Sequence, residues 1–311
     1  MSITVVGSVA FDAVKTPFGE RERMLGGAAT HFALAASFFD QVHVVGRVGA
    51  DFGDDDMAVL AIRGTDVEDV ERVPDGKSFF WAGEYGWDLN SRETLDTQLN
   101  VFEDFQPLLS ASSRDCDVLF LANIQPELQL SVLEQWGQVQ FVAMDSMNLW
   151  NDIARDALVE VIRRVDCVML NDAEFRQLTN RPSIVGAARE VLAMGPSVVV
   201  AKQGEYGAAL ITEDHFFALP AYPLETVIDP TGAGDTFAGG FVGFIASQLD
   251  RRLTRDVLRN AMAYGTALAS FNVERFGTEG LQAVDAPDVH KRVDDLWRFA
   301  HFEPIAVDLI D

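Results

Sequence analysis

The stretch VIDPTGAGDTFAGGF, residues 227–241, places a glycine-rich turn directly before a run of small and aromatic residues. Gly232 and Gly234 flank one alanine, and Asp235 follows at once. The first N–H groups of a helix lack intrahelical partners and lie at the positive end of the helix dipole, so they attract anions. Glycines also let a phosphate approach the backbone closely. The stretch therefore predicts an anion site with a carboxylate beside it.

Two interpretations of Asp235 follow from its position. It is either an acid that stabilises the helix dipole, or a general base that takes a proton from a substrate hydroxyl while the amides hold a phosphoryl group. The turn matches neither the G-x-x-x-x-G-K-[ST] phosphate loop nor the G-x-G-x-x-G dinucleotide fingerprint. The two standard nucleotide motifs therefore do not account for it.

The rest of the chain alternates between apolar, β-branched runs and amphipathic segments. Strands are predicted at 3–11, 42–49, 118–124, 140–145, 167–171, 197–204 and 208–212. Helices are predicted at 27–39, 151–165, 184–194, 233–249, 254–271 and 286–299. Such alternation predicts an α/β fold with three α/β/α layers around a mostly parallel sheet, as one domain over 1–311.

Residues 73–107 depart from this alternation because they combine clustered aromatic residues with turn residues. They predict antiparallel strands that project from the main sheet. We expect a small β lid made from about 10–20 and 73–105 over a site at the carboxyl ends of the strands. The alternative is a structural hairpin or a dimer contact.

The composition limits the classes of partner. The 311 residues carry a net charge of −24, which argues against binding to nucleic acid or to an anionic membrane. No apolar run approaches the ~20 residues of a membrane span, and the first residues lack the basic segment of a signal peptide. Two cysteines, Cys116 and Cys167, suggest reduced thiols in a cytoplasmic protein. The acidity and the low lysine count suggest a halophilic source, with an ordinary acidic enzyme as the alternative.

The segment DPTGAGDTFAGGF closely resembles the C-terminal signature of the ribokinase-like, PfkB-type carbohydrate kinases. This family transfers the γ-phosphoryl group of ATP to a hydroxymethyl group of a sugar or nucleoside. The resemblance implies that Asp235 is the general base. It also implies that the amides of Gly232, Ala233, Gly234 and Asp235 form the anion hole.

Matches near the N-terminus imply an acceptor site. GSVAFD is similar to the family's substrate-binding entry, and there the resemblance places Asp12 on sugar hydroxyls; alone, Asp12 reads as a turn residue. GGAATHFALAASFF (26–39) resembles the N-terminal signature, in which Gly26 and Gly27 admit the substrate. The family usually has Asn where His31 stands, which bears on the substrate; a lone helical His is otherwise more often structural.

Three further residues are candidates for acceptor contacts. The segment MDSMNLW (144–150) replaces a proline-containing element that is common in the family's sugar-specific members. Asp145 and Asn148 are therefore expected to touch the acceptor, together with Gln125.

Other matches imply a nucleotide site. NDAEF (171–175) matches the family's N-x-x-E element, so Asn171 and Glu174 are expected to organise Mg²⁺ and phosphates, largely through water; the alternative is a helix cap. KQGEYG (202–207) matches the K-x-G-x-x-G nucleotide loop, which implies ATP-binding roles for Lys202, Gly204 and Gly207; the alternative is a surface hairpin turn.

Two remaining matches concern a cation and the adenine. Asp229 and Thr231 match positions near which some family members bind a monovalent cation, so K⁺ is a further expected cofactor. The late segment NAMAYGTALASFNVERFG resembles the region that closes over the adenine, with Asn260, Ser270 and Gly277 as candidates.

Together these features predict a kinase that uses ATP and Mg²⁺ to phosphorylate a small sugar. A nucleoside acceptor is the alternative, because the aromatic residues of 79–87 could stack on a nucleobase. A non-catalytic sugar- or nucleotide-binding regulator is a different class, and the retained base and glycines favour an enzyme over it. We expect a monomer or a homodimer formed through the lid.

Overall fold

The computed structural model describes residues 1–137, 139–249, 253–303 and 305. Its main feature is a nine-stranded sheet in the order β13-β12-β11-β10-β9-β8-β1-β4-β5. The strands are β1 (Ser2–Val6), β4 (Gln41–Val48), β5 (Val70–Arg72), β8 (Val118–Leu121), β9 (Phe141–Asp145), β10 (Cys167–Asn171), β11 (Val198–Lys202), β12 (Ala208–Ile211) and β13 (Phe216–Leu219). Pairing is parallel from β11 to β5 and antiparallel at β12 and β13. The predicted mostly parallel sheet is confirmed.

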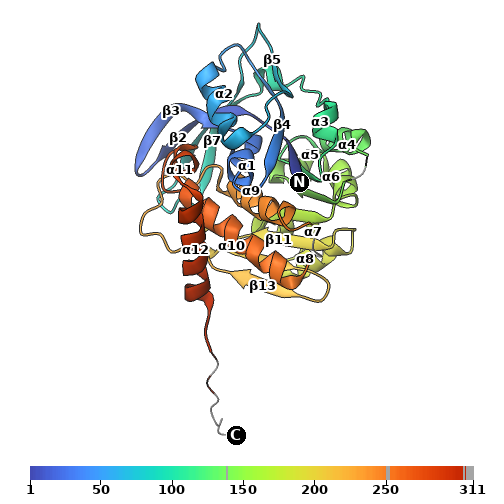
Figure 1. Ribbon diagram of the computed structural model, residues 1–311, viewed down its shortest axis with the longest axis vertical. Helices are drawn as coiled ribbons and strands as arrows, with labels where there is room; N and C mark the ends of the chain where they lie inside the picture. The colour runs from blue at the N-terminus through green and yellow to red at the C-terminus, as the bar shows by residue number, and fades with distance from the viewer. Residues whose placement is uncertain (138, 250–252, 304, 306–311) are drawn as a thin grey trace.

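Helices cover both faces of this sheet (Figure 1). One face carries α1 (Ala28–Ala36), α9 (Ala233–Ala246) and α10 (Arg255–Asn272), with α11 (Glu279–Ala283) and α12 (Ala286–Ala300) beside α10. The other face carries α4 (Pro126–Gln135), α6 (Arg155–Ile162), α7 (Asp172–Thr179) and α8 (Ile184–Leu192). Shorter helices are α2 (Asp54–Leu60), α3 (Ala111–Arg114) and α5 (Asn148–Ile153). The predicted three α/β/α layers are therefore present.

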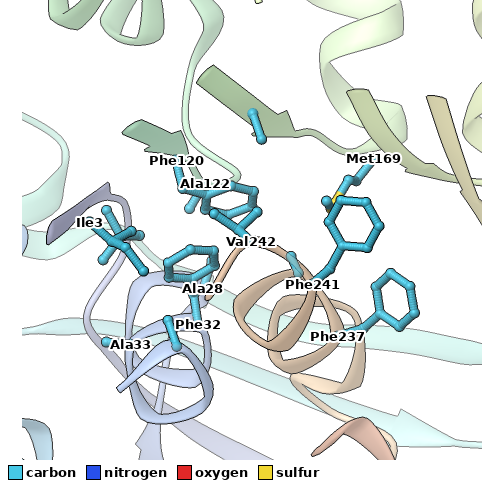
Figure 2. Close-up of a cluster of buried hydrophobic side chains, with 14 of the residues drawn as sticks. Ile3, Ala28, Phe32, Ala33, Phe120, Ala122, Met169, Phe237, Phe241 and Val242 are labelled. Atoms are coloured by element: carbon cyan, nitrogen blue, oxygen red, sulfur yellow. The ribbon is translucent and has the colours of Figure 1, made fainter. Parts of the chain in front are cut away.

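Side chains that alternate along each strand fill two separate cores, because successive residues of a strand point to opposite faces. Val5 packs toward α1 and α9, whereas the next residue, Val6, packs toward α4 and α6. Figure 2 shows the first core, in which Phe32 of α1 packs near Phe120 of the sheet and Phe241 of α9 lies beside Met169. The rings of Phe32 and Phe120 stack with centroids 4.1 Å apart.

A second sheet of four strands lies beside the first, in the order β3-β2-β6-β7. Its strands are β2 (Ala10–Thr16), β3 (Gly19–Gly26), β6 (Phe79–Tyr85) and β7 (Arg92–Gln98). The antiparallel pairing predicted within 73–107 is confirmed between β6 and β7, while β2 and β6 are parallel. The segment 10–20 is too short a description, because the chain turns after Thr16 and returns along β2 as far as Gly26.

Two of the predicted elements are each divided. The single strand predicted at 3–11 is wrong: β1 ends at Val6, and the chain enters the second sheet at Ala10. Gly7 lies at this crossing, where a side-chain carbon would stand 2.7 Å from Cβ of Ala122. The single helix predicted at 151–165 is also wrong, because Ala154 (φ −139°, ψ 31°) separates α5 from α6.

Cys116 and Cys167 are buried and form no disulfide in the part of the chain that the structure describes. None of the helices among the described residues combines the length and the apolar character needed to cross a membrane.

Candidate active site

The carboxyl ends of three neighbouring strands bring together a carboxylate, a side-chain amide and a lysine ammonium. Because β9, β10 and β11 are adjacent and parallel, Asp145, Asn171 and Lys202 finish at the same edge of the sheet. The Lys202 ammonium forms a largely buried ion pair with the Asp145 carboxylate. Burial disfavours the charge on Lys202, but Asp145, Glu174 and Asp235 together outweigh it and raise the lysine pKa. Lys202 is therefore a fixed cation.

The N-terminus of α9 approaches this cation. Gly232 caps the helix with φ +74°, and its carbonyl accepts the amide of Thr236 at 2.8 Å. A side-chain carbon at Gly234 would lie 3.1 Å from Nζ of Lys202, so the bare glycine lets the ammonium reach the helix end. The helix dipole and Lys202 thus supply positive potential at one place, as an anion site requires.

One of the four amides expected in the anion hole is already engaged. The amide of Ala233 donates to the carbonyl of Pro230 at 3.2 Å, because the turn closes on itself there. Gly234 is the next amide along the helix and lies beside Lys202. The Ala233 amide is therefore partly engaged in the turn, and its place in the anion hole stays a prediction, as does that of Gly234.

Asp235 is held in the same cluster with a strongly perturbed pKa. Burial, followed by repulsion from Asp145, raises the pKa of its carboxyl to about 7, against the opposing effect of Lys202. Glu174 responds in the same way for the same reasons, with a pKa of about 7. Carboxyl groups with a pKa near neutrality are suited to proton transfer at physiological pH.

Asn171 and Glu174 form a reciprocal cap at the start of α7. The Asn171 side chain accepts the Glu174 amide at 2.8 Å, and the Glu174 carboxylate accepts the Asn171 amide at 2.7 Å. The helix-cap interpretation is therefore present in the structure. Glu174 is buried, and its pKa is affected by Lys202 and Asp145, so the cap also places its carboxylate at the anion site.

Asp12 lies near Asp235 on the opposite side of the cluster, at the start of the second sheet. A side-chain carbon at Gly26 would collide with the Asp12 carboxylate, and one at Gly27 (φ +95°) would collide with the carbonyl of Ser8. The nearby backbone amide of Gly27 acts to lower the pKa of the Asp12 carboxyl. Burial, then repulsion from Asp229 and Asp235, raises the pKa of Asp12 to about 7. The structure thus brings together Asp12, Gly26 and Gly27.

His31 does not face an acceptor site. Its ring is 1% exposed, and Nδ1 is 3.0 Å from Oδ1 of Asn272. The ring lies so close to Gly232 that a side-chain carbon there would collide with it. Burial lowers the pKa of His31 to about 4, so the ring is neutral. The substrate-binding assignment of His31 is corrected to a position behind the turn.

Asp229 and Thr231 shape the turn itself. The Asp229 carboxylate is fully buried and accepts the amide of Thr231 at 2.9 Å and that of Gly277 at 3.0 Å. The carbonyl of Thr231 accepts the side-chain amide of Asn272 at 2.7 Å. Gly277, expected near the adenine, instead binds the carboxylate behind the turn.

Four other predicted residues lie elsewhere. Asp145 forms an ion pair with Lys202, because β9 and β11 end at the same edge of the sheet with only β10 between them. Gln125 and Asn148 are exposed at the starts of α4 and α5. Asn260 is exposed on α10 and donates to the carbonyl of Asp256 at 2.9 Å. No described contact joins these last three residues to the cluster.

The loop after Lys202 meets the tip of the second sheet. Gly204 (φ +58°) and Gly207 (φ +94°) both adopt left-handed conformations that close the turn between β11 and β12. The side-chain amide of Asn90, at the tip between β6 and β7, donates to the Glu205 carboxylate at 2.9 Å. The small sheet therefore spans the distance from Asp12 to this loop.

Three functional candidates carry weak signals in the sequence. Arg92 is an isolated arginine at the start of an exposed strand, yet its charge lowers the pKa of Asp12, Glu174 and Asp235. Tyr85 pairs with Arg92 across the sheet, and its hydroxyl accepts that of Thr231 at 3.2 Å. Asn272 is the last residue of α10 and lies in the segment that resembles the adenine region, but that resemblance does not mark it. Only the tertiary structure brings them to the site.

A helix N-terminus facing a buried lysine and several carboxylates, at the carboxyl edge of a parallel sheet, defines a phosphotransferase of the α/β class. The model of the pfkB family of carbohydrate kinases matches residues 2–283. The chain therefore belongs to this family and is an ATP-dependent kinase of carbohydrate or nucleoside acceptors.

Individual relatives agree with this assignment. A cytidine kinase of Thermococcus kodakarensis is 30% identical over 249 residues, covering 78% of this chain and 87% of the relative. The fold resembles that of the Methanocaldococcus jannaschii nucleoside kinase, with a TM-score of 0.77 and 20% identity over 94% of this chain and 98% of that one. It also resembles a putative ribokinase II of E. coli in complex with ATP and Mg²⁺, with a TM-score of 0.73 and 20% identity over 94% and 99%.

Proposed function

We propose that the chain is a nucleoside kinase, which moves the γ-phosphoryl group of ATP to the hydroxymethyl group of a nucleoside. The observation that carries the choice of acceptor is the position of Trp81, directly opposite Asp12 in the pairing of β6 with β2. The 30% identity to a cytidine kinase supports the same choice.

Trp81 offers a flat surface beside the carboxylate that would bind the ribose. Its indole lies over Gly83, where any side-chain carbon would collide with the ring, and it is half-buried. The guanidinium of Arg92 lies 5.2 Å from the ring centre. A nucleobase stacked on such a ring gains contact area that a free sugar lacks. A vicinal diol can bind both oxygens of Asp12, as in a ribonucleoside.

The charge near Asp12 favours an uncharged acceptor. Asp229 and Asp235 raise the pKa of Asp12, and Arg92 is the cation that opposes them. A sugar phosphate would bring at least one more negative charge to this cluster, and repulsion between like charges disfavours it. We therefore expect unphosphorylated acceptors.

Asp235 acts as the general base in this proposal. Its carboxylate accepts the proton of the acceptor hydroxyl while that oxygen bonds to the γ-phosphorus, and the bond between the γ-phosphorus and the bridging oxygen of ADP breaks. Lys202 and the amide at Gly234 hold the transferred group as its negative charge shifts toward the bridging oxygen.

The residues on the phosphate side also fit Mg²⁺-ATP. The space between Gly234 and Lys202 is free because glycine lacks a side chain. Glu174 contributes a buried carboxylate beside Lys202. Among the described residues no group of three acidic, His or Cys side chains could hold a metal ion directly. Glu174 would therefore hold Mg²⁺ through water. The bound ion supplies charge neutralisation on the phosphates.

The small sheet is proposed to act as a lid over one kinase domain. It contacts the turn through Tyr85 and Thr231, and the loop after Lys202 through Asn90 and Glu205. In this proposal, the two contacts hold the small sheet over the space between the acceptor and phosphate sites. Exclusion of water there prevents wasteful hydrolysis of ATP.

A kinase assay with Mg²⁺-ATP tests the acceptor. The panel contains cytidine, inosine, adenosine, ribose, fructose and ribose 5-phosphate, and the product is identified by mass spectrometry and by its phosphorylation position. We expect nucleoside monophosphates. A panel in which only free sugars are phosphorylated would contradict the nucleoside assignment while leaving the family assignment intact.

The variant Trp81→Ala tests the stacking surface. We expect the KM for the nucleoside to rise on the order of tenfold, in line with the 1–3 kcal/mol typical of base stacking, while the KM for ATP changes little. Trp297→Ala, on exposed α12, is the matched control. An unchanged nucleoside KM in Trp81→Ala would remove the stacking argument.

A further inference from the structure

The turn before α9 is fixed from behind by two buried polar side chains. Asn272, at the end of α10, donates its side-chain amide to the carbonyl of Thr231 at 2.7 Å. Its side-chain oxygen is 3.0 Å from Nδ1 of His31. Asn272 is fully buried and His31 is 1% exposed. One chain of hydrogen bonds therefore runs from α1 through α10 to the turn.

The direction of these hydrogen bonds follows from the inventory of donors. The Asn272 amide nitrogen is used on the Thr231 carbonyl, so its oxygen must accept, and Nδ1 of His31 must carry the hydrogen. Nε2 is then an unprotonated acceptor, and it is buried without a hydrogen-bond partner among the described residues. The ring is packed flat behind Gly232. The imidazole thus acts as a donor to Asn272 and as a support for the turn.

The same turn holds the residues at which the family resemblance implied a monovalent cation. Such an ion needs several oxygens with free lone pairs. The oxygens here are those of the Asp229 carboxylate and the Thr231 carbonyl, and each already accepts one hydrogen bond. Both oxygens of Asp229 accept backbone amides, from Thr231 and Gly277, and the Thr231 carbonyl accepts the Asn272 amide. The Asn272 N–H group points at this carbonyl and takes one of its two acceptor positions, so these oxygens offer an ion only part of the shell that it needs. The residues present therefore do not fit a cation at this position.

From this we infer that Asn272 and His31 take the place of a monovalent cation behind the anion hole, so that phosphoryl transfer by this chain does not depend on K⁺. The Asn272 amide gives the Thr231 carbonyl the positive partner that an ion would otherwise give, and His31 fixes the amide in that orientation. Both are positioning residues, because neither touches a reacting atom. The inference rests on the proposed kinase activity.

A cation series tests the inference directly. Activity with cytidine and Mg²⁺-ATP is measured in KCl, NaCl or tetramethylammonium chloride at one fixed ionic strength, so that screening by salt is the same throughout. We expect values of kcat that agree within about twofold. A tenfold or greater activation by K⁺ over tetramethylammonium would overturn the inference. Absence of activity in all three salts would instead count against the proposed function.

Variants test the two side chains. Asn272→Ala removes both hydrogen bonds of this side chain, whereas His31→Phe removes only the one between the two residues and keeps a ring of similar shape. We expect kcat to fall at least tenfold in each, with the KM for ATP and cytidine within about threefold. His43→Phe, near the start of β4, is the control for replacing a buried histidine away from the turn. Thr254→Ala removes the N-terminal cap of α10 and is the control for a change at the other end of that helix. Wild-type kcat in Asn272→Ala would overturn the inference.

Diffraction provides a measurement that needs no activity. Crystals of the wild-type protein grown in RbCl are examined for anomalous scattering, since Rb⁺ replaces K⁺. We expect no Rb⁺ peak in contact with the Thr231 carbonyl or the Asp229 carboxylate. A peak bonded to both would overturn the inference even if no substrate had been found.

Discussion

At the scale of single residues, the central proposal is that Asp235 is the general base. Asp235→Asn keeps the shape of the side chain but cannot accept the proton. We expect kcat to fall on the order of 10³-fold with ATP binding retained. The apparent Tm at pH 8 should rise by ~2–4 °C, because a buried charge is removed. Normal turnover in this variant would contradict the role of Asp235 as base.

The raised carboxyl pKa values predict opposite trends for activity and stability. Burial first, then neighbouring carboxylates, raises the pKa of Asp12, Glu174 and Asp235 to about 7. Since folding favours their protonated forms, the folded state binds more protons than the unfolded chain between about pH 4 and pH 7. Their contribution to the free energy of unfolding therefore falls as pH rises through this window.

Activity should follow the reverse course. The proton acceptor must be ionised, so kcat/KM is expected to rise toward a plateau above about pH 7, with an apparent pKa that belongs to the interacting cluster. Rate and thermal-unfolding profiles from pH 5 to 9 measure both trends. A rate already at its plateau at pH 5 would contradict the assignment.

At the scale of elements, the turn before α9 is the part most sensitive to substitution. Gly232→Ala must place a side chain at φ +74° and against the His31 ring, whereas Gly64→Ala meets φ +81° in open space. In both variants, a side chain at positive φ destabilises the folded state by ~1–2 kcal/mol. Only Gly232→Ala should also lose activity, by at least tenfold. Equal activity and equal Tm values in the two variants would show that the turn tolerates displacement.

The link between lid and turn is a second element-scale test. Tyr85→Phe removes the hydroxyl that contacts Thr231 and keeps the buried ring. We expect the KM for the acceptor to rise a few-fold, and unfolding to cost about 1 kcal/mol less. Tyr264→Phe, which loses a contact with His290 away from the site, is the control. Identical kinetics in both variants would remove Tyr85 from lid closure.

The elements that the sequence predicts well are those with long apolar patterns. The strand at 167–171 and the helix at 286–299 agree with β10 and α12 to within one residue. The break at Ala154 and the crossing at Gly7 were missed, because both depend on where neighbouring elements stand. Helix α4 was also missed, since its first turn carries one proline and few buried side chains.

The residues of the site likewise fall into those that local motifs identify and those that only the tertiary structure identifies. Local motifs point to Asp235, Lys202 and Gly234, which the structure brings together. Asp145 was placed on the acceptor side because the order of strands, which pairs it with Lys202, cannot be read from the motif. Arg92 carries no local pattern, and the resemblance of the segment that contains Asn272 does not mark that residue, so only tertiary structure identifies the two.

At the scale of the whole molecule, the charge of −24 predicts a dependence on salt. Repulsion between surface carboxylates destabilises the compact state, and salt shortens its range from ~10 Å at 0.1 M to ~3 Å at 1 M. Three of the four lysines, Lys15, Lys77 and Lys291, are exposed, whereas Lys202 is largely buried in the cluster. We expect the Tm to rise between 0.1 and 2 M NaCl. An unchanged Tm would contradict the halophilic hypothesis.

The most direct test of the nucleoside kinase assignment compares kcat/KM for cytidine and for ribose with Mg²⁺-ATP, using the wild-type protein and Asp235→Asn. The proposed roles of Trp81, Asp12 and Asp235 predict a value at least 100-fold higher for cytidine in the wild type, and loss of transfer to both acceptors in the variant. Equal or better use of ribose, or transfer that persists in Asp235→Asn, would contradict it.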